Sequence, residues 1–129
     1  KWPPGGCSIS ISAPAAAVAI ASLDDLAHLR ANAARIIAER ERLAEALDAL
    51  PGVHVSPSAT NFLLVELPVD DARPVVEALA REGLLVRGYG SGDLRHCIRI
   101  SIGLPEHHDR LIDIVQRELT RPSERVVTA

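Results

Sequence analysis

Residues 97–102 read CIRISI, an alternation of isoleucine with cysteine, arginine and serine. Successive side chains of a β-strand point to opposite faces, so this period of two predicts a strand with one apolar face. The three isoleucines take the core face, and Arg99 then lies on the other face with Cys97 and Ser101. We therefore expect a sheet with one buried and one open face.

Arg99 has two explanations at this stage. Its planar guanidinium can bind a carboxylate or a phosphate through two parallel hydrogen bonds. It can also be an ordinary solvated arginine on an open sheet face, and the residues alone favour this simpler explanation. Arg87 ends the preceding apolar run, LLVR, at a comparable strand position.

Other strands and helices are expected on both sides of this stretch. Short apolar runs between Gly, Pro, Asn and Asp predict strands, and apolar residues at 3–4 spacing predict helices. The expected strands cover residues 53–55, 61–67, 84–87 and 97–102. The expected helices cover residues 12–21, 22–50, 70–81 and 105–119. This order predicts an α+β fold, a small mixed or antiparallel sheet of about four strands covered by helices.

Helix caps and faces can be predicted in more detail. Ser12 is expected to cap the first helix, and Ser22 with Asp25 resembles a capping box for the second. Arg40 falls within the apolar stripe of the long helix, so its stem should pack while its head stays in solvent or pairs with a carboxylate. The stripe is Leu26, Leu29, Ala33, Ile36, Leu43, Leu47 and Leu50. The later helices should bury Val75, Val76, Leu79 and Ala80, and Leu111, Ile112, Val115 and Leu119.

Length and composition limit the class of protein. A chain of 129 residues suits one domain, expected to span residues 1–129 with an irregular segment at 1–11 and a frayed tail at 121–129. A net charge of -3 and one residue each of Trp, Tyr and Phe disfavour nucleic-acid binding. No apolar run is long enough to span a membrane, and no signal peptide is recognisable, so we expect a cytoplasmic protein.

Several common kinds of site are disfavoured by spacing. The five histidines are scattered without the spacing of a metal site, and His96 and Cys97 point to opposite strand faces. The loop GYGSG at 88–92 does not precede a helix, so it lacks the amide donors of a phosphate-binding loop. The chain has thirteen arginines and a single lysine, Lys1, which excludes chemistry that needs a buried lysine.

Several motifs in order resemble one enzyme family. They are AAAVAIASLDDL (15–26), RIIAERERLAEALDALPGV (35–53), SPSATNFLLVEL (56–67), REG (81–83), LLVRGYG (84–90) and CIRISIGLPEHHDRLIDIV (97–115). This series resembles the C-terminal small domain of histidinol-phosphate aminotransferase-like enzymes, which are fold-type I pyridoxal-phosphate transaminases. The resemblance covers nearly the whole chain.

The resemblance implies roles for three residues. Arg99 matches the family's arginine that binds the acidic group of the substrate, Arg87 matches a second anion contact, and Asn61 lies near the edge of the active site. The family's Schiff-base lysine and its aspartate for the pyridine nitrogen belong to a large domain whose motifs are absent here. The resemblance therefore implies that this chain has no catalytic residue and binds no cofactor alone.

Two hypotheses about function follow. In the first, the chain is part of a pyridoxal-phosphate aminotransferase for histidinol phosphate or an aromatic amino acid, and is inactive alone. That enzyme would be a homodimer, with the missing large domain as a further partner. In the second, the chain is a non-catalytic binding or assembly module derived from such a domain.

Overall fold

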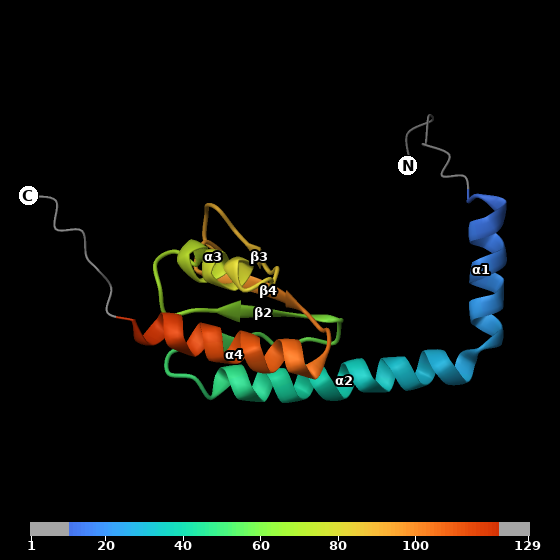
Figure 1. Ribbon diagram of the computed structural model, residues 1–129, viewed down its shortest axis with the longest axis horizontal. Helices are drawn as coiled ribbons and strands as arrows, with labels where there is room; N and C mark the ends of the chain where they lie inside the picture. Colours follow the sequence, from blue (N-terminus) through green and yellow to red (C-terminus); the bar gives the residue numbers. More distant parts are fainter. Residues whose placement is uncertain (1–10, 122–129) are drawn as a thin grey trace, which may run out of the picture. The chain divides into compact units, whose positions relative to one another are not determined.

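The computed structural model describes residues 11–121 (Figure 1). Its internal contacts divide the chain into two compact units, Lys1–Ala34 and Arg35–Ala129. The expected single domain over residues 1–129 stays a prediction. Most of the expected irregular segment and nearly all of the expected tail, residues 1–10 and 122–129, lie outside the described residues.

The first unit contains helix α1 (Ala13–Asp24), whose start was predicted correctly and whose end was not. Ser12 caps it, since its hydroxyl accepts a hydrogen bond from the amide of Ala15 at 3.4 Å. Ser22 does not begin the next helix, because its hydroxyl donates to the Val18 carbonyl and α1 continues past it. Asp25 caps the second helix instead and accepts from the amide of His28 at 3.1 Å.

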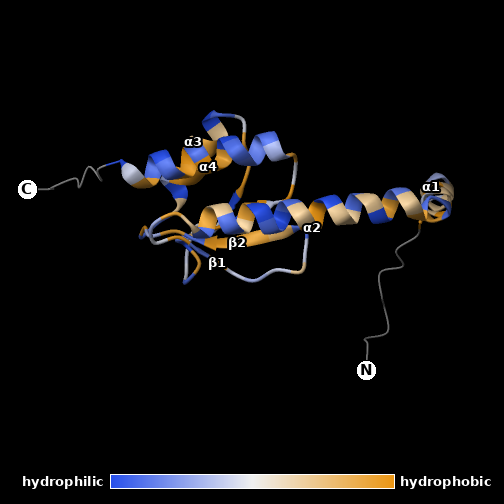
Figure 2. Ribbon diagram, turned by 90° about the horizontal axis from the view of Figure 1, so that it is seen from below, coloured by the Kyte–Doolittle hydropathy of each residue, from blue (hydrophilic) through white to orange (hydrophobic). Residues whose placement is uncertain are grey.

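Helix α2 (Leu26–Asp48) has 23 residues and is shorter at both ends than the expected range 22–50, and much of its apolar stripe is not buried. Leu43 and Leu47 are fully buried, whereas Leu26 and Ile36 are 47% and 37% exposed. Figure 2 shows that hydrophobic residues recur along the whole helix. The expectation of one buried stripe is therefore wrong for the N-terminal half of α2, because periodicity shows which face is apolar and not what covers it.

The second unit is built on a four-stranded antiparallel sheet of order β1-β2-β4-β3. Its strands are β1 (His54–Val55), β2 (Phe62–Glu66), β3 (Arg87–Gly88) and β4 (Cys97–Ser101). Its further helices are α3 (Arg73–Arg81) and α4 (Pro105–Thr120). The predicted α+β fold with four strands is confirmed.

The third strand begins later than predicted. Residues 84–86 are not a strand, because the Leu84 amide donates to the Leu79 carbonyl and completes the end of α3. Val86 is nevertheless half-buried against the core. The chain pairs with β4 only at Arg87 and Gly88. A β-carbon on Gly88 would lie 3.0 Å from a Val76 methyl, so a glycine lets β3 lie close to α3.

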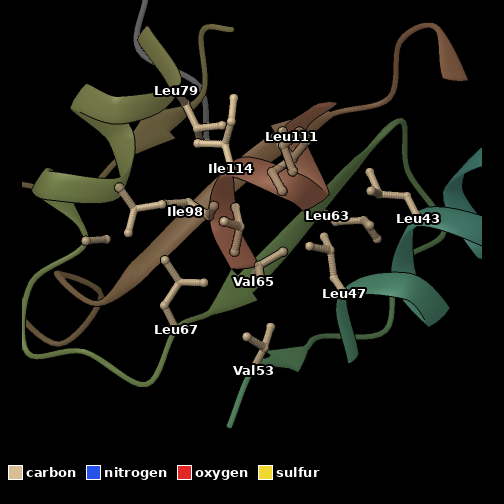
Figure 3. Packing of buried hydrophobic residues seen from close by; sticks show 14 of the residues in the cluster. Leu43, Leu47, Val53, Leu63, Val65, Leu67, Leu79, Ile98, Leu111 and Ile114 are labelled. Carbon is tan, nitrogen blue, oxygen red and sulfur yellow. The ribbon is translucent and has the colours of Figure 1, made fainter. Parts of the chain in front are cut away.

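The hydrophobic core lies on one face of the sheet. Register pairs Leu63 with Ile100 and Val65 with Ile98, which places these four side chains on the same face. The helices contribute Leu43 and Leu47 from α2, Val75, Ala78 and Leu79 from α3, and Leu111, Ile114 and Val115 from α4. Figure 3 shows these helices contributing side chains to one cluster with the strands.

Two helix faces differ from the prediction. On α3 the buried alanine is Ala78, and Ala80 is exposed. On α4 the fully buried set includes His108 and Ile114, whereas Ile112 and Leu119 are only half-buried. In both helices the buried face differs from the predicted one because α3 and α4 pack against each other as well as on the sheet.

Replacement of Ile98 by alanine tests this core. Ile98 is fully buried at the centre of the ladder, so Ile98→Ala should lower the free energy of unfolding by about 2–5 kcal/mol. Leu85→Ala is the control, because Leu85 is 87% exposed and its loss should change stability by less than about 0.5 kcal/mol. Urea unfolding measures both, and equal effects of the two substitutions would contradict the assigned core.

Candidate functional site

The open face is the sheet face opposite the core. By register it carries Phe62, Leu64, Glu66, Arg87, Cys97, Arg99 and Ser101. Arg99 is paired with Leu64 of β2 on one side and with Arg87 of β3 on the other. The prediction that Arg99 faces away from the isoleucines is confirmed. Directly opposed residues have β-carbons about 5 Å apart, so the structure brings the two arginines together.

Each guanidinium lies against an aromatic ring. The Cζ atom of Arg99 is 5.2 Å from the centroid of the Phe62 ring, and that of Arg87 is 5.8 Å from the centroid of Tyr89. Within residues 11–121 neither arginine forms a salt bridge, so no carboxylate of that part neutralises them. Two like charges opposed across strands destabilise a sheet, and an anion bound between them removes that repulsion. The arrangement is therefore suited to binding an anion.

Asn61 lies at the end of the same pair of strands. It is exposed, and its backbone carbonyl accepts a hydrogen bond from the Ile102 amide at 2.8 Å, one residue beyond the β2–β4 ladder. In the described part of the chain no hydrogen bond joins its side chain to Arg87 or Arg99. We call Arg87, Arg99 and Asn61 the candidate anion site, and the role of each stays a prediction.

A polar network that sequence analysis missed, centred on a buried histidine, lies beside the end of β4. His108 is 3% exposed, and its Nδ1 is 2.6 Å from a carboxylate oxygen of Glu39 on α2. Its Nε2 accepts a hydrogen bond from the Gly103 amide at 3.1 Å. Arg42 donates two hydrogen bonds to Glu39, at 2.7 and 2.9 Å, and pairs with Asp109. We call these residues the His108 network.

The network keeps Glu39 charged. The hydrogen bonds from Arg42, opposed by burial and assisted by His108, lower the pKa of Glu39 from 4.5 to about 2. The same contact with Glu39 raises the pKa of Arg42 above its ordinary range. An ionised carboxylate against a buried imidazole is therefore a permanent feature of the fold at neutral pH.

Other chemistry has little support in the described part of the chain. Cys97 is fully buried, and burial raises the pKa of its thiol, which makes it a poor nucleophile. Residues 11–121 contain no cluster of three or more His, Cys, Asp or Glu side chains suited to a metal ion. No helix among them is long and apolar enough to cross a membrane.

The family described as "Aminotransferase class I and II" matches residues 1–115. The chain is a member of the class I and II aminotransferases. A histidinol-phosphate aminotransferase of Roseiflexus castenholzii is 46% identical over 110 residues, 83% of this chain and 30% of that protein. The predicted resemblance to histidinol-phosphate aminotransferase-like enzymes is thereby confirmed.

Solved structures agree with this aminotransferase assignment. The histidinol-phosphate aminotransferase of Sinorhizobium meliloti, in complex with pyridoxal-5'-phosphate, has a TM-score of 0.69 at 32% identity and covers 78% of this chain and 28% of that one. A decarboxylase from Sulfurospirillum multivorans has a TM-score of 0.59 at 30% identity, and the match covers 66% of this chain and 25% of that one. The chain spans about a third of the length of the curated aminotransferases that it matches.

The charge state of Glu39 in this aminotransferase domain can be tested through stability. The folded-state pKa of about 2 lies below the ordinary 4.5, so the carboxylate stabilises the fold above pH 4.5 and this contribution is lost as the pH falls toward 2. Glu39→Gln should therefore destabilise the protein most near neutral pH and least in acid. Urea unfolding at stepped pH measures the difference from wild type.

Glu45→Gln is the matched control, because Glu45 is an exposed glutamate of the same helix with no salt bridge among the described residues. Its effect should be small at every pH. A difference in the free energy of unfolding between wild type and Glu39→Gln that does not change with pH would contradict the lowered pKa of Glu39.

Proposed function

We propose that this chain supplies the substrate-anion site of a pyridoxal-phosphate-dependent aminotransferase acting on histidinol phosphate. The observation that carries the proposal is the pair Arg87 and Arg99, opposed across β3 and β4 on the open face with no carboxylate partner among residues 11–121. The planar fork of a guanidinium donates two parallel hydrogen bonds to phosphate oxygens, and two guanidinium groups bind a phosphate more strongly than one.

A phosphorylated substrate fits this site better than a simple aromatic amino acid. A carboxylate carries one negative charge and is satisfied by one guanidinium, whereas a phosphate monoester approaches two charges at neutral pH. Two opposed arginines therefore match the phosphate in charge. The names of the relatives at 46% and 32% identity support the same substrate.

The three residues of the site have distinct roles in this proposal. Arg99 lies in the centre of the ladder, between Leu64 and Arg87, and binds the phosphate in a fixed position. Arg87 is the second contact, and Asn61 bounds the site at the end of β2. Fixing one end of a substrate orients its other end, and orientation contributes to the rate without any proton transfer by these residues.

The described residues do not fit the cofactor itself. Pyridoxal phosphate is held in such enzymes through a lysine amino group, and it supplies an electron sink for the reaction. The sequence has a single lysine, Lys1, and residues 11–121 contain none. Cofactor binding thus falls to the large domain, and we expect the chain alone to be inactive. The complete enzyme would be a homodimer.

Removal of Arg99 tests the proposal. In the complete enzyme, Arg99→Ala should lower kcat/KM for histidinol phosphate at least tenfold, a loss of about 1.4 kcal/mol or more in transition-state binding. Arg81→Ala is the matched control, since Arg81 is an exposed arginine at the end of α3 and its loss changes the net charge equally. Steady-state kinetics measures both enzymes, and unchanged kinetics for Arg99→Ala would remove Arg99 from the site.

The assembly hypothesis also has an observation in its favour. In the first unit Val18, Ile20 and Leu23 are each more than 60% exposed on α1, although helices of soluble proteins usually bury such residues. Exposed apolar clusters are typical of surfaces that contact another chain or domain. In this alternative the chain associates with a large-domain polypeptide through α1 without taking part in catalysis.

Sedimentation velocity tests the assembly role. A mixture of this chain with a separately produced large domain should form a complex, and the joint change Val18→Ser and Leu23→Ser should weaken it at least tenfold. Leu85→Ser is the control, because Leu85 is an isolated exposed leucine of the second unit. Independent sedimentation of the two polypeptides would argue against this alternative.

A further inference from the structure

The strand ends beside the candidate anion site are fixed by two consecutive amides. The Ile102 amide donates to the Asn61 carbonyl at 2.8 Å, and the next amide, that of Gly103, donates to Nε2 of His108 at 3.1 Å. Helix α4 begins directly afterwards and has no side-chain cap at Leu104. His108 therefore holds Gly103 in the short segment 102–104 between β4 and α4, which has no regular secondary structure.

The hydrogen-bond partners determine the state of the His108 ring. A backbone amide can only donate, so Nε2 accepts, and we assign the ring hydrogen of the neutral form to Nδ1. That hydrogen points to Glu39, whose oxygen lies 2.6 Å away. Both ring nitrogens are thus satisfied in a side chain that is 3% exposed.

Helix α2 holds both strand ends through adjacent residues. Glu39 binds His108, and Arg40 donates to the Thr60 carbonyl at 3.1 Å, directly before Asn61. The side chain of Arg40 is 14% exposed, so its stem packs as expected and its head reaches a backbone carbonyl. The end of the sheet nearest Asn61 is therefore fixed from one helix at two points.

We propose that His108 is a positioning residue for the candidate anion site, holding the end of β4 after Arg99 through Gly103 while its ring is neutral. This inference rests on the proposed function of Arg99. Ser101, two residues after Arg99, is paired with Phe62, and the Phe62 ring lies against the Arg99 guanidinium. A shift of the strand end at Gly103 therefore reaches the guanidinium through Ser101 and Phe62.

Protonation of the ring changes these contacts. A charged imidazole donates from both nitrogens, so Nε2 loses the Gly103 amide and turns to the Ser101 carbonyl, 3.4 Å away. The charged groups around it are Glu39 and Arg42 of α2 and Asp109 of α4.

Two substitutions separate the contacts of the ring. Glutamine places its amide near the position of Nε2, so His108→Gln keeps an acceptor for Gly103 that cannot be protonated. Asparagine reaches only the position of Nδ1, so His108→Asn keeps a donor for Glu39 and loses Gly103.

Hydrogen exchange of the Gly103 amide, followed by NMR on the full chain, tests the first step. At one fixed pH the Gly103 amide should be protected similarly in the His108 protein and in His108→Gln, because both keep an acceptor for it. His108→Asn should lack this protection. Equal protection in all three proteins would overturn the proposal, and so would loss of protection in His108→Gln.

Calorimetric titration with sulfate, a dianion, tests the second step. His108→Asn should bind sulfate about fivefold more weakly than the His108 protein, and His108→Gln within about twofold of it. Changed Gly103 exchange with unchanged sulfate affinity would reduce His108 to a structural role. Absence of sulfate binding to the His108 protein would instead refute the anion site, and this inference with it.

Discussion

The antiparallel ladder between β2 and β4 is the constraint on which the rest of the structure depends. It pairs five residues on each strand, and its period of two assigns every side chain to the core face or to the open face. A slip of one residue would place Arg99 in the core and Ile98 and Ile100 in solvent. Burial of the two isoleucines therefore also fixes the sheet face on which Arg99 lies and its position along the strand. The core and the candidate site are set by the same register.

Sequence analysis was accurate where one local pattern decides the outcome. The alternation in residues 97–102 gave the correct faces of β4, and Pro and Gly positions gave the end of α3 and both ends of α4 to within one residue, although α3 begins three residues later than predicted. It was wrong where the outcome depends on a distant partner. The run of residues 84–86 has strand composition, yet the Leu84 amide closes α3. The stripe of α2 is continuous in sequence, but of its members only Leu43 and Leu47 are fully buried.

The residues of the candidate site differ in the same way. The alternation of residues 97–102 is enough to show that Arg99 faces away from the core. Arg87 lies opposite Arg99 because β3, a strand of only two residues, pairs with β4. No periodicity in the sequence indicates this pairing. The role of His108 cannot be found from sequence, because its partner Glu39 is 69 residues away. The partners of buried polar side chains are determined by tertiary packing. The only signal in the sequence is that His108 is a polar residue on the inner face of a helix.

The proposed role of the domain separates binding from chemistry. Solved structures of at least 30% identity to this chain include both an aminotransferase and a decarboxylase. In the proposal, the domain supplies positive charge in a fixed place. Arg87 and Arg99 are directly opposed across β3 and β4, and like charges in such a pair repel each other. An anion bound between them would relieve this repulsion, so part of the affinity would already be built into the empty fold.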